Sequence, residues 1–354
     1  MHENTGDKYS TPQVTRPLKR GKKVAILGAG NMGSALASVM GRNGERIALW
    51  DHFDEVVEEI NRSRTNSRYL PGVTLSGRVT ASGDATECVE GAEVVVIAVP
   101  SPFVGTVVSG VTDAIRRDAV VLNVVKGLDQ KNERPIFTEI AELLPGRSQC
   151  LLAGPAIANE FARQELTVVN LAADESEARE RVASLLENSR FHTTTTDDMM
   201  GAALGGILKN IYALLFGYLE TAFPSGRNFE AALLSRAATE MGDIGEAFGA
   251  RRATLYGLAG LGDLAATALS SHSHNRKCGR LLGQGKPVQA IRQEMGVLPE
   301  SIRAAAAVLR WIRSGRPEAP LAAVAGGLAA GERFDMTDVL RSFAKARCEA
   351  LHGR

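Results

Sequence analysis

Short apolar runs alternate with amphipathic segments through the first half of the chain. The apolar runs predict strands in the sequences KKVAILGAG (22–30), RIALW (46–50), EVVVIAVP (93–100), AVVLNVV (119–125), CLLAG (150–154) and LTVVNLAA (166–173). The segments between them predict helices over residues 31–43, 54–63, 103–116 and 133–144. Apolar strands separated by helices are typical of a parallel sheet covered on both faces, so this pattern predicts an α/β fold.

The pattern changes near the sequence TTTTDDMMG (193–201). Segments rich in Ala, Leu and Gly then predict helices over residues 199–222, 228–248, 286–295, 299–313 and 319–330. We expect an α/β domain over residues 22–197 and an all-α domain over residues 198–354, which suits a chain of 354 residues. Residues 1–21 are polar and have no apolar segment of a signal peptide, so we interpret them as a disordered leader.

Charge and composition exclude several classes of protein. The 41 basic and 40 acidic residues give no whole-chain attraction to nucleic acid or to an anionic membrane. The four cysteines lie far apart without CxxC spacing, as is typical of reduced cytoplasmic thiols. The six histidines form no ligand-spaced pair beyond His272 and His274 in a polar loop, so we expect no metal site.

The predicted helix 199–222 contains GAALGGILKNIYALLFG (201–217), where Lys209 and Asn210 interrupt an apolar stretch. A lysine near the middle of a membrane span costs about 2.5–3.5 kcal/mol on insertion scales. Glycines weaken the case for such a span further. We therefore expect a buried helix of a soluble protein without membrane insertion.

The sequence VAILGAGNMG (24–33) contains the pattern GxGxxG at Gly28, Gly30 and Gly33. It follows a predicted strand and begins a predicted helix, the context in which it indicates a dinucleotide-binding turn. Gly28 would allow the tight turn, Gly30 the approach of a pyrophosphate and Gly33 the packing of helix on strand. The pyrophosphate would face free N–H groups at the helix N-terminus. The alternative is a glycine turn without a ligand.

Asp51 ends the second predicted strand, about 20 residues after the glycines, where a ribose-binding acid is expected. Its carboxylate would accept hydrogen bonds from the ribose hydroxyls and repel a 2′-phosphate, which favours NAD over NADP. His52 would stack on the adenine or partly tolerate a phosphate. The alternative is that Asp51 only caps the following turn.

Further segments resemble a known family. They are INRSRTNSRYLPGV (60–73), AVPS (98–101), VVKGL (124–128), GGILKN (205–210), Asn228 with AALLSR (231–236), GLAGLGDLAAT (257–267) and SHSHNRKCGRLLGQG (271–285). Together they are similar to the NAD(P)-dependent glycerol-3-phosphate dehydrogenases of the bacterial cytosolic type, over about residues 22–335. The resemblance implies a Rossmann domain, a helical domain and an active site between them. It also implies reversible oxidation of sn-glycerol 3-phosphate to dihydroxyacetone phosphate.

The resemblance also implies roles for individual residues. Lys209 falls at the family's proton-transferring lysine. Other active-site positions fall at Lys126, Asn210, Asp263 and Thr267. Substrate contacts are implied for Lys126, Gly154, Ser273, His274 and Asn275. Besides the glycine turn, Asp51 and His52, cofactor contacts are implied for Asn31, Met32, Pro100, Lys126, Ala158 and Glu300.

The chemistry of a buried lysine agrees with the role implied for Lys209. Oxidation of a secondary alcohol needs a base for the hydroxyl proton, and the reverse reaction needs an acid at the same place. Burial lowers the pKa of a lysine from about 10.4, because the ammonium loses its water. Asp263, on a glycine-flanked loop, would limit that fall by pairing with it, and Asn210 would orient the substrate hydroxyls. The alternative is a lysine that extends to the surface.

Two other residues of the set also have structural alternatives. Lys126 follows a buried strand, at the edge of the sheet where α/β proteins bind ligands, but it could be an ordinary exposed loop lysine. Asp263 and Thr267 are four residues apart and point the same way if a helix begins at Asp263. Otherwise Asp263 is an N-cap without a chemical task.

Two segments depart from the family pattern. The family's Ser-Arg-Asn is SHN at 273–275, and its SGPSFA is AGPAIA, with Ala153 and Ala156 in place of serines. An imidazole cannot reproduce the bidentate contact of an arginine with a phosphate, although Arg276 or Lys277 could compensate in part. We therefore expect weaker binding of the substrate phosphate, or a related substrate.

Two other functions stay open. One is a related dehydrogenase acting on 3-hydroxyacids, ketopantoate or sugar acids, although the YLPG, GLGD and SxN segments favour the glycerol-phosphate branch. The other is a catalytically inactive NAD(H)-binding paralogue, which would need none of Lys126, Lys209 and Asp263. The apolar content of the helical domain also favours a homodimer.

Overall fold

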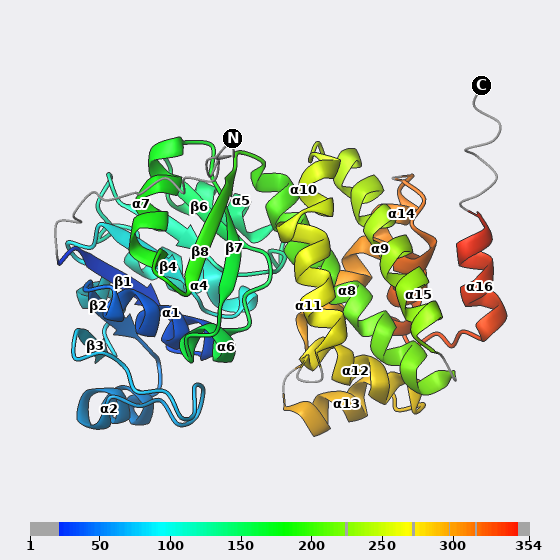
Figure 1. The fold of residues 1–354 in the computed structure, drawn as a ribbon, viewed down its shortest axis with the longest axis horizontal. Coiled ribbons are helices and arrows are strands. Elements are labelled where there is room, and N and C mark those ends of the chain that lie inside the picture. Colours follow the sequence, from blue (N-terminus) through cyan, green and yellow to red (C-terminus); the bar gives the residue numbers. More distant parts are fainter. Residues whose placement is uncertain (1–20, 224–225, 271–272, 297, 316, 346–354) are drawn as a thin grey trace, which may run out of the picture.

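The computed structural model describes residues 21–223, 226–270, 273–296, 298–315 and 317–345. It contains a sheet-based domain, blue to green in Figure 1, and a helical domain, green to red. This confirms the predicted combination of an α/β domain and an all-α domain. Residues 1–20 of the predicted leader, and His272, lie outside the described residues.

The first domain contains all the strands of the described chain. They are β1 (Lys23–Leu27), β2 (Arg46–Trp50), β3 (Val79–Ser82), β4 (Val94–Ile97), β5 (Val120–Asn123), β6 (Gln149–Ala153), β7 (Thr167–Ala172) and β8 (Phe191–Thr196). Its helices are α1 (Asn31–Arg42), α2 (Asp54–Ser63), α3 (Ala85–Val89), η1 (Ser101–Phe103), α4 (Val104–Val111), α5 (Ile136–Leu143), α6 (Ala158–Ala162) and α7 (Ser176–Leu186).

The second domain is helical throughout its described residues. Its elements are α8 (Met199–Ala222), α9 (Arg227–Ala247), α10 (Arg252–Tyr256), the π-helical turn η2 (Leu258–Gly262), α11 (Asp263–Leu269), α12 (His274–Gly283), α13 (Val288–Met295), α14 (Glu300–Arg313), α15 (Pro320–Ala329) and α16 (Met336–Lys345).

The eight strands form one sheet in the order β3-β2-β1-β4-β5-β6-β7-β8. From β3 to β6 all neighbours are parallel, and the chain order reverses between β1 and β4. In such a sheet, ligands bind outside the carboxyl ends of the strands at the point of reversal. The glycine-rich turn follows β1 and Pro100 follows β4, so both lie at this point.

The predicted parallel sheet is confirmed from β3 to β6 but does not continue to β7. Residues 151–153 of β6 pair with residues 170–172 of β7 in antiparallel register, and β8 then runs parallel to β7. An apolar run predicts a strand but not its direction, because a strand presents the same two faces whichever way it runs.

Several elements were not predicted from the apolar pattern. The edge strand β8 reads FHTTTT and is mostly exposed or half-buried, so it has no apolar run. Strand β3 has four residues, VTAS, only one of them buried. The missed helices are α3, α6, α7, α10, α11, α12 and α16. Predicted helices 103–116 and 133–144 are shorter in the structure, which has them at Val104–Val111 and Ile136–Leu143.

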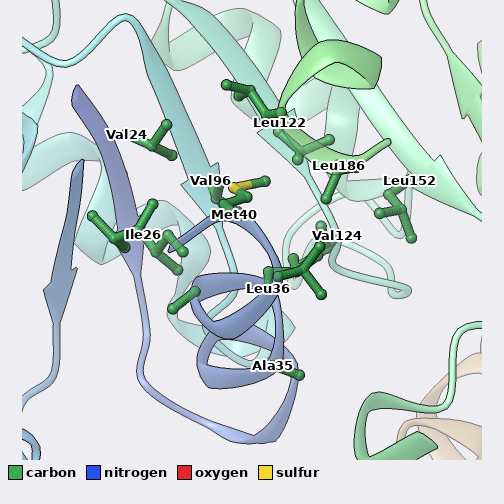
Figure 2. Close-up of a cluster of buried hydrophobic side chains, with 14 of the residues drawn as sticks. Val24, Ile26, Ala35, Leu36, Met40, Val96, Leu122, Val124, Leu152 and Leu186 are labelled. Carbon is green, nitrogen blue, oxygen red and sulfur yellow. The ribbon is translucent and has the colours of Figure 1, made fainter. Parts of the chain in front are cut away.

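Helix α1 is fixed on the sheet by an apolar core. Leu36 and Met40 of α1 pack against Ile26, Val96 and Leu122 from three adjacent strands, and all five are fully buried (Figure 2). Full burial of such a side chain contributes about 1.5–3 kcal/mol. This packing holds the N-terminus of α1 at the carboxyl end of β1.

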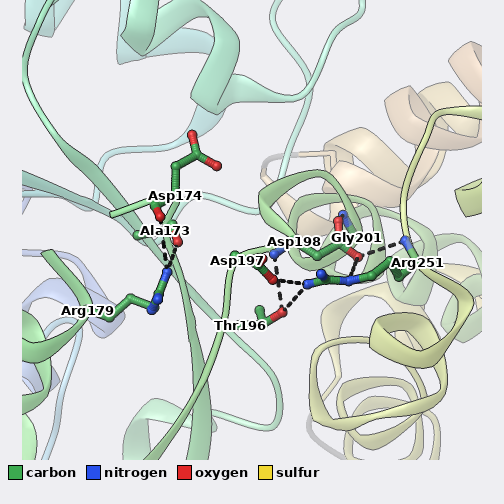
Figure 3. Close-up of polar contacts among 8 residues, drawn as sticks. All are labelled: Ala173, Asp174, Arg179, Thr196, Asp197, Asp198, Gly201 and Arg251. Carbon is green, nitrogen blue, oxygen red and sulfur yellow. Dashed lines mark hydrogen bonds and ion pairs between the residues drawn. The ribbon is translucent and has the colours of Figure 1, made fainter. Parts of the chain in front are cut away.

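Helix α8 is the buried centre of the helical domain, and its bounds are those predicted. It is long and apolar enough to cross a membrane, but 83% of its most apolar window is buried inside the protein. The prediction of a buried helix is confirmed. Figure 3 shows how α8 begins: Asp198 accepts hydrogen bonds from the N–H groups of Gly201 (2.8 Å) and Arg251 (2.8 Å), and the Arg251 guanidinium also contacts Asp197.

Candidate active site

Both domains line a cavity of about 950 Å³ at the reversal point of the sheet. It brings together the following predicted residues: Gly28, Gly30, Asn31, Met32, Asp51, His52, Pro100, Lys126, Lys209, Asn210, His274, Asn275 and Glu300. Residues that sequence reasoning missed also line it: Trp50, Phe53, Tyr69, Ser101, Phe103, Thr106, Val107 and Pro299. Ser101 and Tyr69 belong to the AVPS and YLPG segments and Pro299 precedes Glu300, so their position in or beside these segments was the available signal.

Each glycine of the glycine-rich turn meets a different steric demand. Gly28 has a φ of +112°, and a Cβ there would lie 2.9 Å from the backbone of Ala98. A Cβ on Gly33 would lie 1.9 Å from the carbonyl oxygen of Gly28, so only glycine allows this packing of helix on strand. A Cβ on Gly30 would meet nothing within 4 Å, and Gly30 borders the cavity at the uncapped N-terminus of α1.

Asp51 connects the end of β2 with the glycine-rich turn. Its Oδ2 accepts a hydrogen bond from the Ala29 N–H at 3.0 Å, and its Oδ1 accepts one from the Phe53 N–H at 3.0 Å. Asp51 therefore does cap the following turn, as the alternative proposed. It also contacts the glycine-rich turn and borders the cavity. The side chain is only 8% exposed.

Two lysines from different domains share one buried carboxylate. Lys209 Nζ donates to Asp263 Oδ1 at 2.7 Å and to Thr267 Oγ1 at 2.9 Å. Lys126 Nζ donates to Asp263 Oδ2 at 2.5 Å and to the carbonyl oxygen of Gly154 at 3.1 Å. This cluster joins β5, α8 and α11 at the wall of the cavity.

The pKa values of Lys209 and Asp263 are both lowered in this cluster. Burial lowers the pKa of Lys209 to about 8, which Lys126 assists and Asp263 opposes. Burial alone would raise the pKa of Asp263, but the Lys126 and Lys209 cations outweigh it and hold that pKa below its usual value. Lys209 can therefore exchange a proton near neutral pH while Asp263 stays ionised.

The surface alternatives for the two lysines are wrong. The side chains of Lys209 and Lys126 are 13% and 17% exposed, so neither extends into solvent. Asp263 does begin helix α11, directly after η2, and its two carboxylate oxygens accept from Lys126 and Lys209. Thr267 therefore lies one turn further on the same face, beside Lys209.

One end of the cavity is formed by α8 and the start of α12. Asn275 Nδ2 donates to Asn210 Oδ1 at 2.8 Å, which fixes both amides. Ser273 caps α12 by accepting from the Arg276 N–H, and His274, the first helical residue, borders the cavity. The Arg276 guanidinium donates to Glu220 at 2.9 Å. It therefore does not take the place of the family's arginine, which is His274 in this chain.

Six of the predicted site residues are not part of the cavity lining: Gly33, Gly154, Ala158, Asp263, Thr267 and Ser273. Ala158 is 5% exposed and packs in the core under α1, because it begins α6, which lies against that helix. Ala153 is buried at the end of β6, while Ala156 borders the cavity. Gly154, with a φ of +95°, contributes its carbonyl oxygen to Lys126.

Glu300 and Ser101 connect the domains on another side of the cavity. Ser101 Oγ donates to Glu300 Oε1 at 2.6 Å, and Arg303 donates to the same hydroxyl at 3.3 Å. At the outer end, Asn31 Nδ2 donates to the Tyr69 carbonyl at 2.6 Å. Among the described residues, no group of three His, Cys, Asp or Glu could hold a metal ion.

A Rossmann sheet whose glycine-rich turn shares a cavity with a buried lysine of lowered pKa defines a nicotinamide-dinucleotide oxidoreductase. Two family models match the chain, the NAD-dependent glycerol-3-phosphate dehydrogenase N-terminus over residues 23–179 and C-terminus over residues 198–332. The chain belongs to the NAD-dependent glycerol-3-phosphate dehydrogenase family, and its cofactor is NAD(P).

Individual relatives agree with this assignment. A glycerol-3-phosphate dehydrogenase (NAD(P)+) of Clostridium perfringens is 36% identical over 282 residues, 80% of this chain and 85% of the relative. One of Listeria innocua is 36% identical over 295 residues, 82% and 87% of the two chains. The crystal structure of a Coxiella burnetii glycerol-3-phosphate dehydrogenase is 31% identical with a TM-score of 0.83, covering 94% of this chain and all of that one.

Proposed function

We propose that this enzyme interconverts sn-glycerol 3-phosphate and dihydroxyacetone phosphate, with Lys209 as general acid and base. The observation that carries the proposal is the Lys209 amine. It borders the cavity that also contains the glycine-rich turn, and its pKa is lowered to about 8. A proton-transfer group works best when its pKa is near the operating pH.

The residues around the glycine-rich turn fit the dinucleotide. Gly30 has no side chain and the N–H groups at the start of α1 are uncapped, so a pyrophosphate could approach them closely. The carboxylate of Asp51, which borders the cavity, could accept hydrogen bonds from the ribose hydroxyls. Asn31 and Met32 complete this part of the lining. The bound nicotinamide supplies acceptance or delivery of a hydride at the substrate carbon.

Lys209 has hydrogen-bonding capacity left for the substrate. An ammonium has three N–H donors, and Asp263 and Thr267 accept two of them. The third is available to the substrate oxygen. In the reducing direction Lys209 gives its proton to that oxygen, and in the oxidising direction the neutral amine removes it. Asn210, fixed by Asn275, is placed to orient the substrate hydroxyls.

Lys126 provides a positive charge beside Asp263 throughout proton transfer. When Lys209 is neutral, Lys126 still pairs with Asp263 at 2.5 Å, so the buried carboxylate never loses its counter-charge. His274 and the start of α12 lie where a substrate phosphate would be bound. The domain division at residues 197 and 198, a cytoplasmic location and a homodimer are further parts of this proposal.

The test is oxidation of NADH and NADPH with dihydroxyacetone phosphate, compared with a panel of small 2-keto acids. We expect turnover with dihydroxyacetone phosphate, and about a thousandfold loss of kcat in Lys209→Ala with NADH binding near normal. Lys286→Ala, at a surface lysine paired with Glu294, is the control and should retain full turnover. Turnover of keto acids alone, NADH binding without any turnover, or an active Lys209→Ala would each refute the proposal.

A further inference from the structure

Gly205 and Gly206 lie in the buried helix α8, one turn before Lys209. A glycine inside a helix costs about 1 kcal/mol relative to alanine. Two in succession therefore indicate that something must approach the helix closely on this face. Each of the two glycines faces a different neighbour.

Gly205 allows η2 to lie directly against α8. A Cβ on Gly205 would lie 2.2 Å from the carbonyl oxygen of Ala259 and 3.1 Å from Gly260 Cα. Both belong to η2, which leads without a break into Asp263. The distance between η2 and α8 therefore governs how near the Asp263 carboxylate comes to Lys209.

Gly206 allows the stem of Lys126 to cross α8. A Cβ on Gly206 would lie 3.1 Å from Lys126 Cγ and 3.3 Å from its Cδ. This is closer than an ordinary contact, so an alanine would push the stem of Lys126 away from the helix. The ammonium of Lys126 would then move relative to Asp263 and Lys209.

We propose that Gly205 and Gly206 are positioning residues that set the charge state of Lys209, Gly205 by holding Asp263 close and Gly206 by holding Lys126 close. The predicted change in kcat rests on the proposed acid and base role of Lys209. The predicted change in the titration of Lys209 does not. Thr267 is the remaining polar neighbour of Lys209, and it is uncharged. His274 and Glu300 are the other titratable groups of the helical domain that line the cavity.

The two glycines act on Lys209 in opposite directions. Asp263 stabilises the ammonium and raises the pKa of Lys209, whereas Lys126 repels it and lowers that pKa. Displacing η2 should therefore make Lys209 more acidic, and displacing Lys126 should make it less acidic. A purely structural effect of an extra methyl group would not change sign between adjacent residues.

The experiment measures the titration of Lys209 in the cofactor-free full chain, by the pH dependence of its acylation with acetic anhydride, followed by mass spectrometry. The pH dependence of kcat for dihydroxyacetone phosphate reduction is measured in parallel. We expect the labelling midpoint of Gly206→Ala to rise by about one pH unit and that of Gly205→Ala to fall by about one. The falling alkaline limb of kcat should move in the same directions.

A matched control is the same substitution at a closely packed glycine of another helix, Gly326 of α15. In Gly326→Ala the new Cβ would lie 2.6 Å from Leu309 Cβ in α14, so stability should fall while the labelling midpoint stays unchanged. Midpoints that stay constant or move in the same direction in both variants would overturn the proposal. If Gly205→Ala does not fold, the labelling midpoint of Gly206→Ala alone tests the proposal. That variant should fold, because the flexible stem of Lys126 can move by a few tenths of an ångström to make room for the methyl group. Labelling that shifts without a shift in kcat would support the positioning role and refute the acid and base role.

Discussion

The basic residues in and beside the cavity differ in the partners that their side chains contact. Lys126 and Lys209 share the carboxylate of Asp263, and Arg276 is directed to Glu220. In the described part of the lining, His274 is the side chain at the start of α12, where a substrate phosphate would meet it. A single imidazole provides one donor, whereas a guanidinium forms a bidentate contact with phosphate.

His274→Arg should therefore strengthen substrate binding. We expect the KM for dihydroxyacetone phosphate to fall about tenfold with little change in kcat, because the added charge-assisted bonds act on a phosphate that does not react. Steady-state kinetics at fixed NADH measure this. His192→Arg, on the exposed strand β8, adds the same charge away from the cavity and should leave KM as it is. An unchanged KM in His274→Arg would show that the phosphate is held elsewhere.

At the scale of elements, α8 combines a structural and a chemical task. Its side chains form the core of the helical domain, and yet Lys209 and Asn210 interrupt the apolar face at the cavity. The helix starts at the junction of the domains, where Asp198 accepts from Gly201 and from Arg251. One cap therefore fixes both the start of α8 and the loop before α10.

Asp198→Ala should destabilise this junction. Loss of an N-cap costs about 0.5–2 kcal/mol, and here the Arg251 N–H also loses its acceptor. We expect the free energy of unfolding in urea to fall by about 2 kcal/mol. Asp198→Asn keeps an oxygen acceptor for the cap and should lose less than half as much. Equal losses in both variants would mean that the charge, not the cap, is what matters.

The apolar pattern predicted the elements that are buried and regular. The bounds of α8 and most strands of the sheet followed from it, because buried parallel strands and long helices have a clear period. The polar edge strand β8 did not, because it has no apolar run, and the reversal at β7 did not, because an apolar run leaves the direction of a strand open. The glycine turn and Asp51 followed from spacing. The meeting of Lys126, Lys209 and Asp263 depends on tertiary packing through η2, and only the family resemblance anticipated it.

At the scale of the whole molecule, the cavity couples cofactor binding to stability, since both domains contribute to its lining. A ligand at a hundred times its Kd stabilises the native state by about 2.7 kcal/mol. Asp51 is directed both to the glycine-rich turn and to the cavity, where it would repel a 2′-phosphate.

We therefore expect NADH to raise the melting temperature more than NADPH at equal concentration. Differential scanning fluorimetry measures the two shifts. Asp51→Asn removes the charge but keeps an oxygen acceptor for the turn, so the difference between the two cofactors should shrink. A larger shift with NADPH than with NADH in the unaltered chain would contradict this preference.

The reversal of β7 determines where the helical domain joins the sheet. Because β7 and β8 run opposite to β1–β6, α8 begins beside the middle of β6 and runs toward the strand ends that line the cavity. Lys209 is ten residues into α8, about 15 Å from its start. A rotation of the helical domain by about ten degrees about Asp198 would thus swing the amine by about 2–3 Å, comparable with a hydrogen-bond length.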